Sequence, residues 1–198
     1  MLLYRLVIVL WRPVAWIVFR PCVRGRENVA AKGGLVVCPN HLSGLDAFAV
    51  AYALAPRTVR NMGKNQLFRR PLLGRAVRSL GAFPARPADG VAGGVAAASA
   101  LAAGGAAVVI FPEGARRRGR ISRPRTGAAR TALVADVPLV PAAVRGTDGW
   151  RRRLRWQIAF GTPVALDDLA GRDLNEAARE ATRRLWESMT ALEATLWP

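Results

Sequence analysis

The chain has 198 residues and a formal net charge of +17, with 30 Lys and Arg against 13 Asp and Glu. This length suffices for one domain with a proper hydrophobic core, and no Ser/Gly-rich or Pro-rich linker divides the sequence. Two cysteines, Cys22 and Cys38, are too few for a disulfide framework. So basic a surface favours a polyanionic partner, either a nucleic acid or the phosphate-rich face of a membrane.

The N-terminal segment, MLLYRLVIVLWRPVAWIVFR, is apolar for most of its length. Arg5 and Arg12 interrupt it and Pro13 breaks its middle, and it also contains Trp11 and Trp16. The arginines disfavour a clean membrane span, whereas the tryptophans are typical of the headgroup level of a bilayer. We therefore expect residues 1–24 to form a helical segment, kinked near Pro13, that lies in the membrane interface. A plain first helix packed on the core is the alternative.

After this segment, short apolar runs alternate with longer amphipathic ones, which is typical of an α/β fold. We expect a single domain over residues 25–198, with a mixed sheet flanked by helices. The predicted strands are Leu35–Cys38, Val59–Met62, Ala82–Ala85, Ala107–Phe111, Leu139–Val144 and Gln157–Phe160. The predicted helices are Leu45–Leu54, Asn65–Leu80, Val91–Ala103, Gly127–Ala135 and a C-terminal helix from about Asn175 to Leu196.

The stretch PNHLSGLDAFAV contains the only histidine of the chain, His41, followed five positions later by Asp46. The apolar run LVVC ends just before it, which places His41 at the carboxyl end of a predicted strand, where ligands bind in open α/β sheets. An Asp held on Nδ1 fixes the imidazole tautomer and leaves Nε2 free to take a proton from a hydroxyl. From these residues alone, the pair is either a catalytic dyad suited to acyl transfer or a capping or core histidine.

The stretch VVIFPEGARRRGR is a second candidate, because a predicted strand runs into a turn that carries Glu113. Arginines follow at positions 116, 117, 118 and 120. The planar guanidinium recognises phosphate in a bidentate manner, and Glu113 is placed to bind a substrate hydroxyl or to orient an arginine. A solvated basic loop is the alternative. Two further stretches are GAFPAR, a short strand that ends in Arg86, and VPLVPAAV, whose two prolines suit a strand near a sheet edge.

In chain order, NHLSGLD, GAFPAR, FPEGAR and VPLVP resemble the four sequence blocks of the glycerolipid acyltransferases of the lysophosphatidic acid acyltransferase (1-acylglycerol-3-phosphate O-acyltransferase) type. The resemblance covers about Leu35 to Val144. It implies that His41 is the general base for the acceptor hydroxyl and that Asp46 orients it. The hydroxyl would then attack the thioester of an acyl-CoA or acyl-carrier-protein donor without a covalent acyl-enzyme.

The resemblance also implies the residues that bind the acceptor. Arg86, Glu113, Gly114 and Arg116 match the acceptor-binding positions of the family, and Lys64 matches a basic position that assists phosphate binding. No cofactor and no metal are implied, and the sequence has no cluster of metal ligands. Ala115 stands where the family usually has a hydroxyl residue, so the acceptor stays open between a lysophosphatidate, another lysophospholipid and a lipid with another polar head.

These features together predict a peripheral or monotopic acyltransferase on the cytoplasmic face of the cell membrane, whose first candidate reaction converts 1-acylglycerol-3-phosphate to phosphatidic acid. Its expected partners are the lipid bilayer, the lysophospholipid acceptor and the acyl donor. One alternative is a nucleic-acid-binding module that uses the WRRRLRW stretch, Trp150–Trp156. No recognisable nucleic-acid motif supports it, so no nucleic acid is expected. The other alternative is a non-catalytic, basic lipid-binding protein of the same fold.

Overall fold

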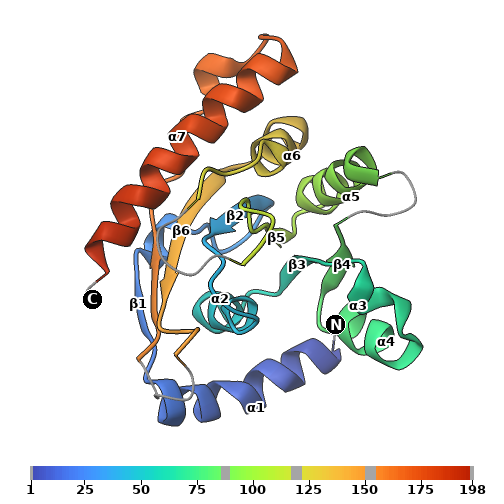
Figure 1. Cartoon of the computed structure of the whole chain (residues 1–198), viewed down its shortest axis with the longest axis vertical. Coiled ribbons are helices and arrows are strands. Elements are labelled where there is room, and N and C mark those ends of the chain that lie inside the picture. The colour runs from blue at the N-terminus through green and yellow to red at the C-terminus, as the bar shows by residue number, and fades with distance from the viewer. Residues whose placement is uncertain (1, 86–89, 117–121, 150–154, 197–198) are drawn as a thin grey trace.

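The computed structural model describes residues 2–85, 90–116, 122–149 and 155–196, and these residues form a three-layer α/β arrangement (Figure 1). A mixed sheet lies in the middle. The strands are β1 (Cys22–Arg24), β2 (Leu35–Pro39), β3 (Val59–Gly63), β4 (Ala82–Pro84), β5 (Ala107–Val109), β6 (Leu139–Arg145) and β7 (Gln157–Phe160). The helices are α1 (Leu2–Phe19), α2 (Asp46–Leu54), α3 (Gln66–Arg69), α4 (Pro71–Ser79), α5 (Gly90–Ala103), α6 (Gly127–Ala135) and α7 (Leu174–Thr195).

The sheet has the strand order β1-β7-β6-β2-β5-β3-β4. The five strands from β6 to β4 are parallel, whereas β7 is antiparallel to β6 and parallel to β1. The predicted α/β fold with a mixed sheet is therefore confirmed. The expectation that the prolines of VPLVP mark a sheet edge is wrong, because β6 lies inside the sheet between β7 and β2. Pro141 lies just beyond the last residue pair between β6 and β7, and its carbonyl accepts the N–H of Gly161 at 2.9 Å.

Both faces of the sheet are covered, which explains why β2 is buried along its whole length. Successive side chains of a strand point to opposite faces. Leu35 and Val37 accordingly join the core under α1 and α2, while Val36 and Cys38 join the core under α5, α6 and α7. Figure 1 shows α1 and α2 on one side of the sheet and α5, α6 and α7 on the other.

The N-terminal helix α1 runs continuously through Pro13. One side of it packs on the core through Tyr4, Ile8, Ala15 and Phe19, and the Phe19 ring stacks on Trp156 with 4.1 Å between ring centroids. The opposite side exposes large apolar residues: Leu6, Val9, Leu10, Val14, Trp16, Ile17 and Val18. Within the described ranges, no helix has the length and apolar character that crossing a membrane requires. The membrane-interacting role of residues 1–24 stays a prediction.

Most predicted elements are present, with two differences. The predicted helix Asn65–Leu80 is divided into α3 and α4, because Pro71 forces the preceding Arg70 into an extended conformation and then starts a new helix. Strand β1 was not predicted. It is a three-residue strand at the sheet edge, paired with β7.

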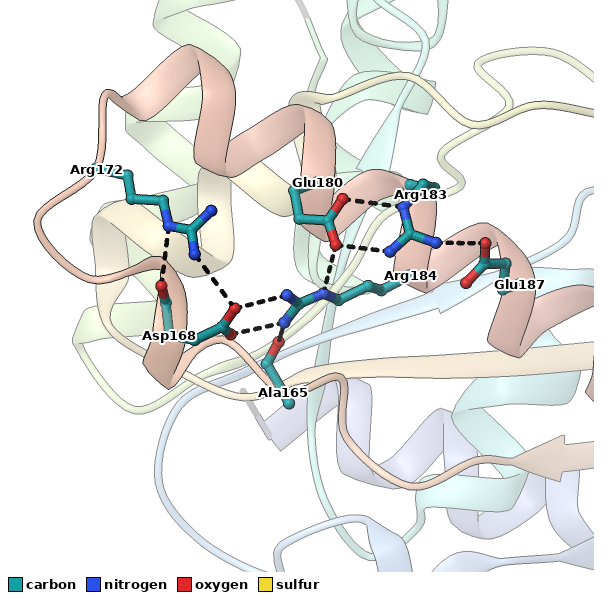
Figure 2. Close-up of polar contacts among 7 residues, drawn as sticks. All are labelled: Ala165, Asp168, Arg172, Glu180, Arg183, Arg184 and Glu187. Carbon is teal, nitrogen blue, oxygen red and sulfur yellow. Dashed lines mark hydrogen bonds and ion pairs between the residues drawn. The ribbon is translucent and has the colours of Figure 1, made fainter.

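Helix α7 packs one side on the sheet and carries ion pairs on its outer side. Ala177, Ala181, Leu185 and Met189 are buried on the core. The helix begins at the N-cap Asp173, whose side chain accepts from two backbone N–H groups of the first turn. Its arginines and glutamates form the network in Figure 2, which also includes Asp168 in the turn between β7 and α7. This network therefore ties the turn to the helix.

Candidate active site

The carboxyl ends of the parallel strands bring four loops to one edge of the sheet. His41 follows β2, Lys64 follows β3, Glu113 follows β5 and Thr147 follows β6. Arg86, the predicted acceptor-binding residue after β4, lies outside the described residues. The same holds for Arg117, Arg118 and Arg120 of the predicted arginine cluster.

His41 and Asp46 form a hydrogen-bonded pair, with 2.8 Å between His41 Nδ1 and Asp46 Oδ2. The Asp46 side chain is fully buried, whereas 16% of the His41 side chain is exposed. The His41 ring stacks on Phe111 with 4.2 Å between ring centroids. Because the carboxylate occupies Nδ1, the ring nitrogen left for a substrate is Nε2. The pair thus has the geometry of a general base in which the carboxylate orients the imidazole through Nδ1 and Nε2 is left for a substrate.

Asp46 accepts hydrogen bonds from three groups besides His41. Its Oδ2 atom also accepts the backbone N–H of Leu42 at 2.7 Å and that of Ser43 at 2.8 Å. Its Oδ1 atom accepts the hydroxyl of Thr147 at 2.5 Å. Asp46 is also the first residue of α2, where the N-terminal end of the helix favours negative charge. All of these groups suit an ionised carboxylate, which can only accept hydrogen bonds.

The loop after β6 supports the loop that carries the dyad. The backbone carbonyl of Thr147 accepts the Ser43 hydroxyl at 3.0 Å, and the same hydroxyl accepts the N–H of Leu45 at 3.0 Å. The Asn40 side chain donates to the Val144 carbonyl at 3.0 Å and accepts the Val144 N–H at 2.6 Å. Thr147 is fully buried. Sequence reasoning missed it, because it lies 101 residues from Asp46 and no local spacing links the two.

Glu113 is buried, with 5% of the residue exposed, and both of its carboxylate oxygens accept from the protein. Oε1 accepts the backbone N–H of His41 at 2.9 Å. Oε2 accepts the backbone N–H of Ser122 at 3.1 Å and the Ser122 hydroxyl at 2.8 Å. Glu113 therefore joins the dyad loop to the segment before α6. Its role in acceptor binding stays a prediction.

Glycines at two positions give the neighbouring arginines room. Gly114 has a φ of +71°, which favours glycine, and a Cβ there would lie 3.1 Å from the guanidinium carbon of Arg125. A Cβ on Gly44, in the dyad loop, would lie 3.2 Å from Nη2 of Arg116. Arg116 thus lies beside the loop that carries His41.

A cavity of about 290 Å³ opens at His41. Besides His41, the lining includes two cationic side chains, those of Lys64 and Arg116. Its other walls are mainly apolar and come from α1, α2, α3 and α4: Tyr4, Val7, Ile8, Ala47, Phe48, Ala51, Leu67, Val77 and Leu80. The structure therefore brings the predicted residues His41, Lys64 and Arg116 together in the wall of one largely apolar cavity.

A sequence profile described as "Acyltransferase" matches residues 20–145, more than half of the chain. The chain belongs to the Acyltransferase family. The matched region contains every predicted site residue, from His41 to Arg116. The expectations of no cofactor and no metal stay predictions.

Individual relatives carry more specific names. The chain is 26% identical over 177 residues to the 1-acyl-sn-glycerol-3-phosphate acyltransferase of Bacillus subtilis, with 88% of each protein covered. It is 29% identical over 145 residues to the enzyme of that name from Limnanthes douglasii, covering 70% of this chain and 50% of the plant protein.

A solved structure shares the fold of this acyltransferase. It is that of the 1-acyl-sn-glycerophosphate (LPA) acyltransferase PlsC from Thermotoga maritima, with a TM-score of 0.69 and 20% sequence identity. The match covers 94% of this chain and 77% of that protein. The architecture described above is therefore one on which such an enzyme is built.

Proposed function

We propose that the protein transfers a fatty acyl group from an acyl thioester to the free hydroxyl of a lysophospholipid, with 1-acylglycerol-3-phosphate as the first candidate acceptor and phosphatidic acid as the product. The observation that carries this proposal is the His41–Asp46 pair, whose imidazole lines a largely apolar cavity together with two cationic side chains. The names of the Bacillus and Limnanthes relatives support the choice of acceptor.

In this mechanism Nε2 of His41 takes the proton of the acceptor hydroxyl, and the hydroxyl oxygen attacks the thioester carbonyl carbon. The C–S bond breaks as the tetrahedral intermediate collapses, and the leaving thiolate takes the proton from the imidazolium. Asp46 stabilises the imidazolium that forms between these two steps. The products are an ester and a free thiol, and no acyl group is attached to the protein.

The charged and apolar parts of the cavity have separate roles in substrate binding. Arg116 and Lys64 line the cavity beside His41, so they face the phosphate of the acceptor. Glu113 keeps the His41 backbone in place through its hydrogen bond with that residue's N–H. The apolar walls from α1 to α4 suit a fatty acyl chain.

We propose that the enzyme works at the cytoplasmic surface of the membrane as a peripheral or monotopic protein, and the exposed apolar side of α1 supports contact with a bilayer. Trp16, Ile17 and Leu10 are each more than 60% exposed there. The opposite side of the same helix supplies Tyr4, Val7 and Ile8 to the cavity wall. A bilayer against α1 would therefore lie close to the cavity that receives the acyl chain.

The test is release of free thiol from palmitoyl-CoA by the detergent-solubilised protein, with and without lysophosphatidate, for wild type and for His41→Ala. We expect release that requires the acceptor and falls by about 10²–10⁴-fold in His41→Ala. A blank with protein alone corrects for Cys22 and Cys38. Phosphatidic acid is measured in the same samples, and circular dichroism checks that the variant is folded.

Activity that survives in His41→Ala would contradict the mechanism. Lipid binding by both proteins without turnover on a panel of lysolipids would instead favour a non-catalytic lipid-binding protein.

A further inference from the structure

A second and larger cavity, of about 990 Å³, lies between α5 and α6 at the same edge of the sheet. Its charged lining residues are Lys64, Arg125 and Arg130. None of the described residues that line it is an aspartate or a glutamate. This cavity therefore presents a positive field to anything that enters it.

The two cavities meet beside the dyad. Met62, Lys64, Gln66 and Phe111 line both of them. The Phe111 ring also stacks on His41, so the boundary between the cavities lies at the catalytic ring. A molecule that reacts at His41 can thus extend in one direction into the apolar cavity and in the other into the basic one.

The basic cavity also contains the start of α6. Gly127 and Ala128, the first residues of this nine-residue helix, line it, and the side chain of the preceding Thr126 makes no capping hydrogen bond. The first N–H groups of a helix have no acceptor within the helix, and its N-terminal end carries partial positive charge. Arg125 lies two residues before Gly127 in the sequence and lines the same cavity. An anionic group at this point would meet a guanidinium and backbone N–H groups together.

The length of this cavity indicates which of the two substrates it suits. It is lined by α6 residues from Gly127 to Val134, which are seven positions apart and therefore about 10 Å apart along the helix axis. The phosphate of a lysophosphatidate is only a few bonds from the attacking hydroxyl, so it reaches Lys64 and Arg116 without entering the far part of the cavity. An acyl thioester, in contrast, has an apolar chain on one side of its carbonyl and a long polar arm, ended by phosphate, on the other.

We propose that the α5–α6 cavity binds the phosphopantetheine arm of the acyl donor, the chemistry that acyl-CoA and an acyl-carrier protein share, with its phosphate held by Arg125 and the first turn of α6. The thioester carbonyl then lies at Phe111, within reach of the hydroxyl that His41 activates, and the acyl chain lies in the apolar cavity. This inference rests on the proposed function, because it assigns a site to the donor of that reaction.

Steady-state kinetics with Arg125→Glu test the assignment. We expect the donor KM to rise by about tenfold or more, since one charge-assisted contact becomes repulsive, while the acceptor KM changes less than about twofold. Arg123→Glu is the matched control, because it makes the same change of charge at a residue that is also exposed but does not line the cavity. A rise in the acceptor KM, or equal effects of the two variants, would overturn the proposal. Arg130 is less suitable, because its guanidinium also donates to Asn175 of α7.

Equilibrium binding without an acceptor separates this proposal from the proposed function. Coenzyme A, 4′-phosphopantetheine and pantetheine are titrated into wild type and Arg125→Glu. We expect wild type to bind the two phosphorylated probes more tightly than pantetheine, and Arg125→Glu to lose this preference. If the preference is present but no acyl transfer occurs, the cavity assignment holds and the proposed function fails. If transfer is normal and Arg125→Glu keeps the preference, the cavity assignment fails alone.

Discussion

The buried carboxylates of the site and the exposed carboxylates of α7 are bound by different kinds of donor. Asp46 and Glu113 accept from backbone N–H groups, hydroxyls and one imidazole. The carboxylates on and near α7 accept from guanidinium groups instead (Figure 2). The first set fixes loops, whereas the second set neutralises arginines.

The α7 network is extensive and exposed. Arg184 lies 2.6 Å from Asp168 and 2.8 Å from Glu180, and Arg183 lies 2.6 Å from Glu187. Hydrogen bonds from Arg183 and Arg184 lower the pKa of Glu180 to about 2. The hydrogen bond from Arg184 likewise lowers the pKa of Asp168. These acids are charged at neutral pH and cancel part of the positive charge of their own helix.

This difference shows that the positive side chains behind the net charge of +17 are not all equally free to bind a ligand, because some of them are paired with carboxylates. The ion pairs of Arg172, Arg183 and Arg184 lie on α7 and the turn before it. Lys64, Arg116 and Arg125 take part in none of them. Because the site carboxylates are satisfied by neutral donors and the imidazole, the cations beside them are left for an anionic substrate.

Among the substitutions that test this difference, we expect Asp46→Asn to have the largest effect on activity. The amide would place its NH₂ group either against the donors of His41, Leu42 and Ser43 or against the Thr147 hydroxyl, and it cannot stabilise an imidazolium as a carboxylate does. We expect kcat to fall by about 10²–10⁴-fold. Asp168→Asn removes, in the same way, a carboxylate that pairs with Arg184 of α7, and it should leave kcat unchanged. Comparable losses in both variants would contradict the assignment of Asp46.

Thr147 tests whether the neutral donors of the site position the dyad. Thr147→Val keeps the shape of the side chain but removes the hydroxyl that Asp46 Oδ1 accepts, so we expect kcat to fall by about tenfold with little change in KM. Thr147→Ser retains the hydroxyl and should recover most of the activity. A loss in Thr147→Val that Thr147→Ser does not recover would indicate a packing role.

Arg184→Ala gives the smallest expected effect, on stability alone. Exposed ion pairs contribute little, so Tm at pH 7 should fall by roughly 1–3 °C with kcat unchanged. The folded-state pKa of Glu180 is lowered from 4.5 to about 2, so its contribution is present above pH 4.5 and is lost as the pH falls toward 2. The Tm difference between wild type and variant should therefore narrow below pH 4.5. A difference that grows on acidification would contradict this origin.

The sequence allowed prediction of the elements that have a local signal. The apolar run LVVC predicts a strand buried on both faces, and β2 is such a strand. Pro71 is also a local sign that a helix begins there, because proline is common at the first position of a helix. The amphipathic pattern continues on both sides of Pro71, however, and it predicts one helix instead of two. Strand β1 had no such pattern, because three residues at a sheet edge are too few to show a periodicity.

The site was predictable where its residues share one loop and was hidden where they do not. His41 and Asp46 are five residues apart, so their hydrogen bond follows from a single turn. The contacts of Asp46 with Thr147 and of Glu113 with His41 depend on which strands are neighbours in the sheet. One sequence gives no information on that order, so Thr147 and Ser122 were missed.

Cys38 gives the strand that carries the dyad a chemical reporter. Its thiol is fully buried in β2, three residues before His41, and burial raises its pKa. Thiol reagents attack the thiolate, so Cys38 is protected for as long as this strand stays in the sheet. The rate at which an alkylating reagent modifies Cys38 therefore measures how often the centre of the sheet opens, independently of any substrate.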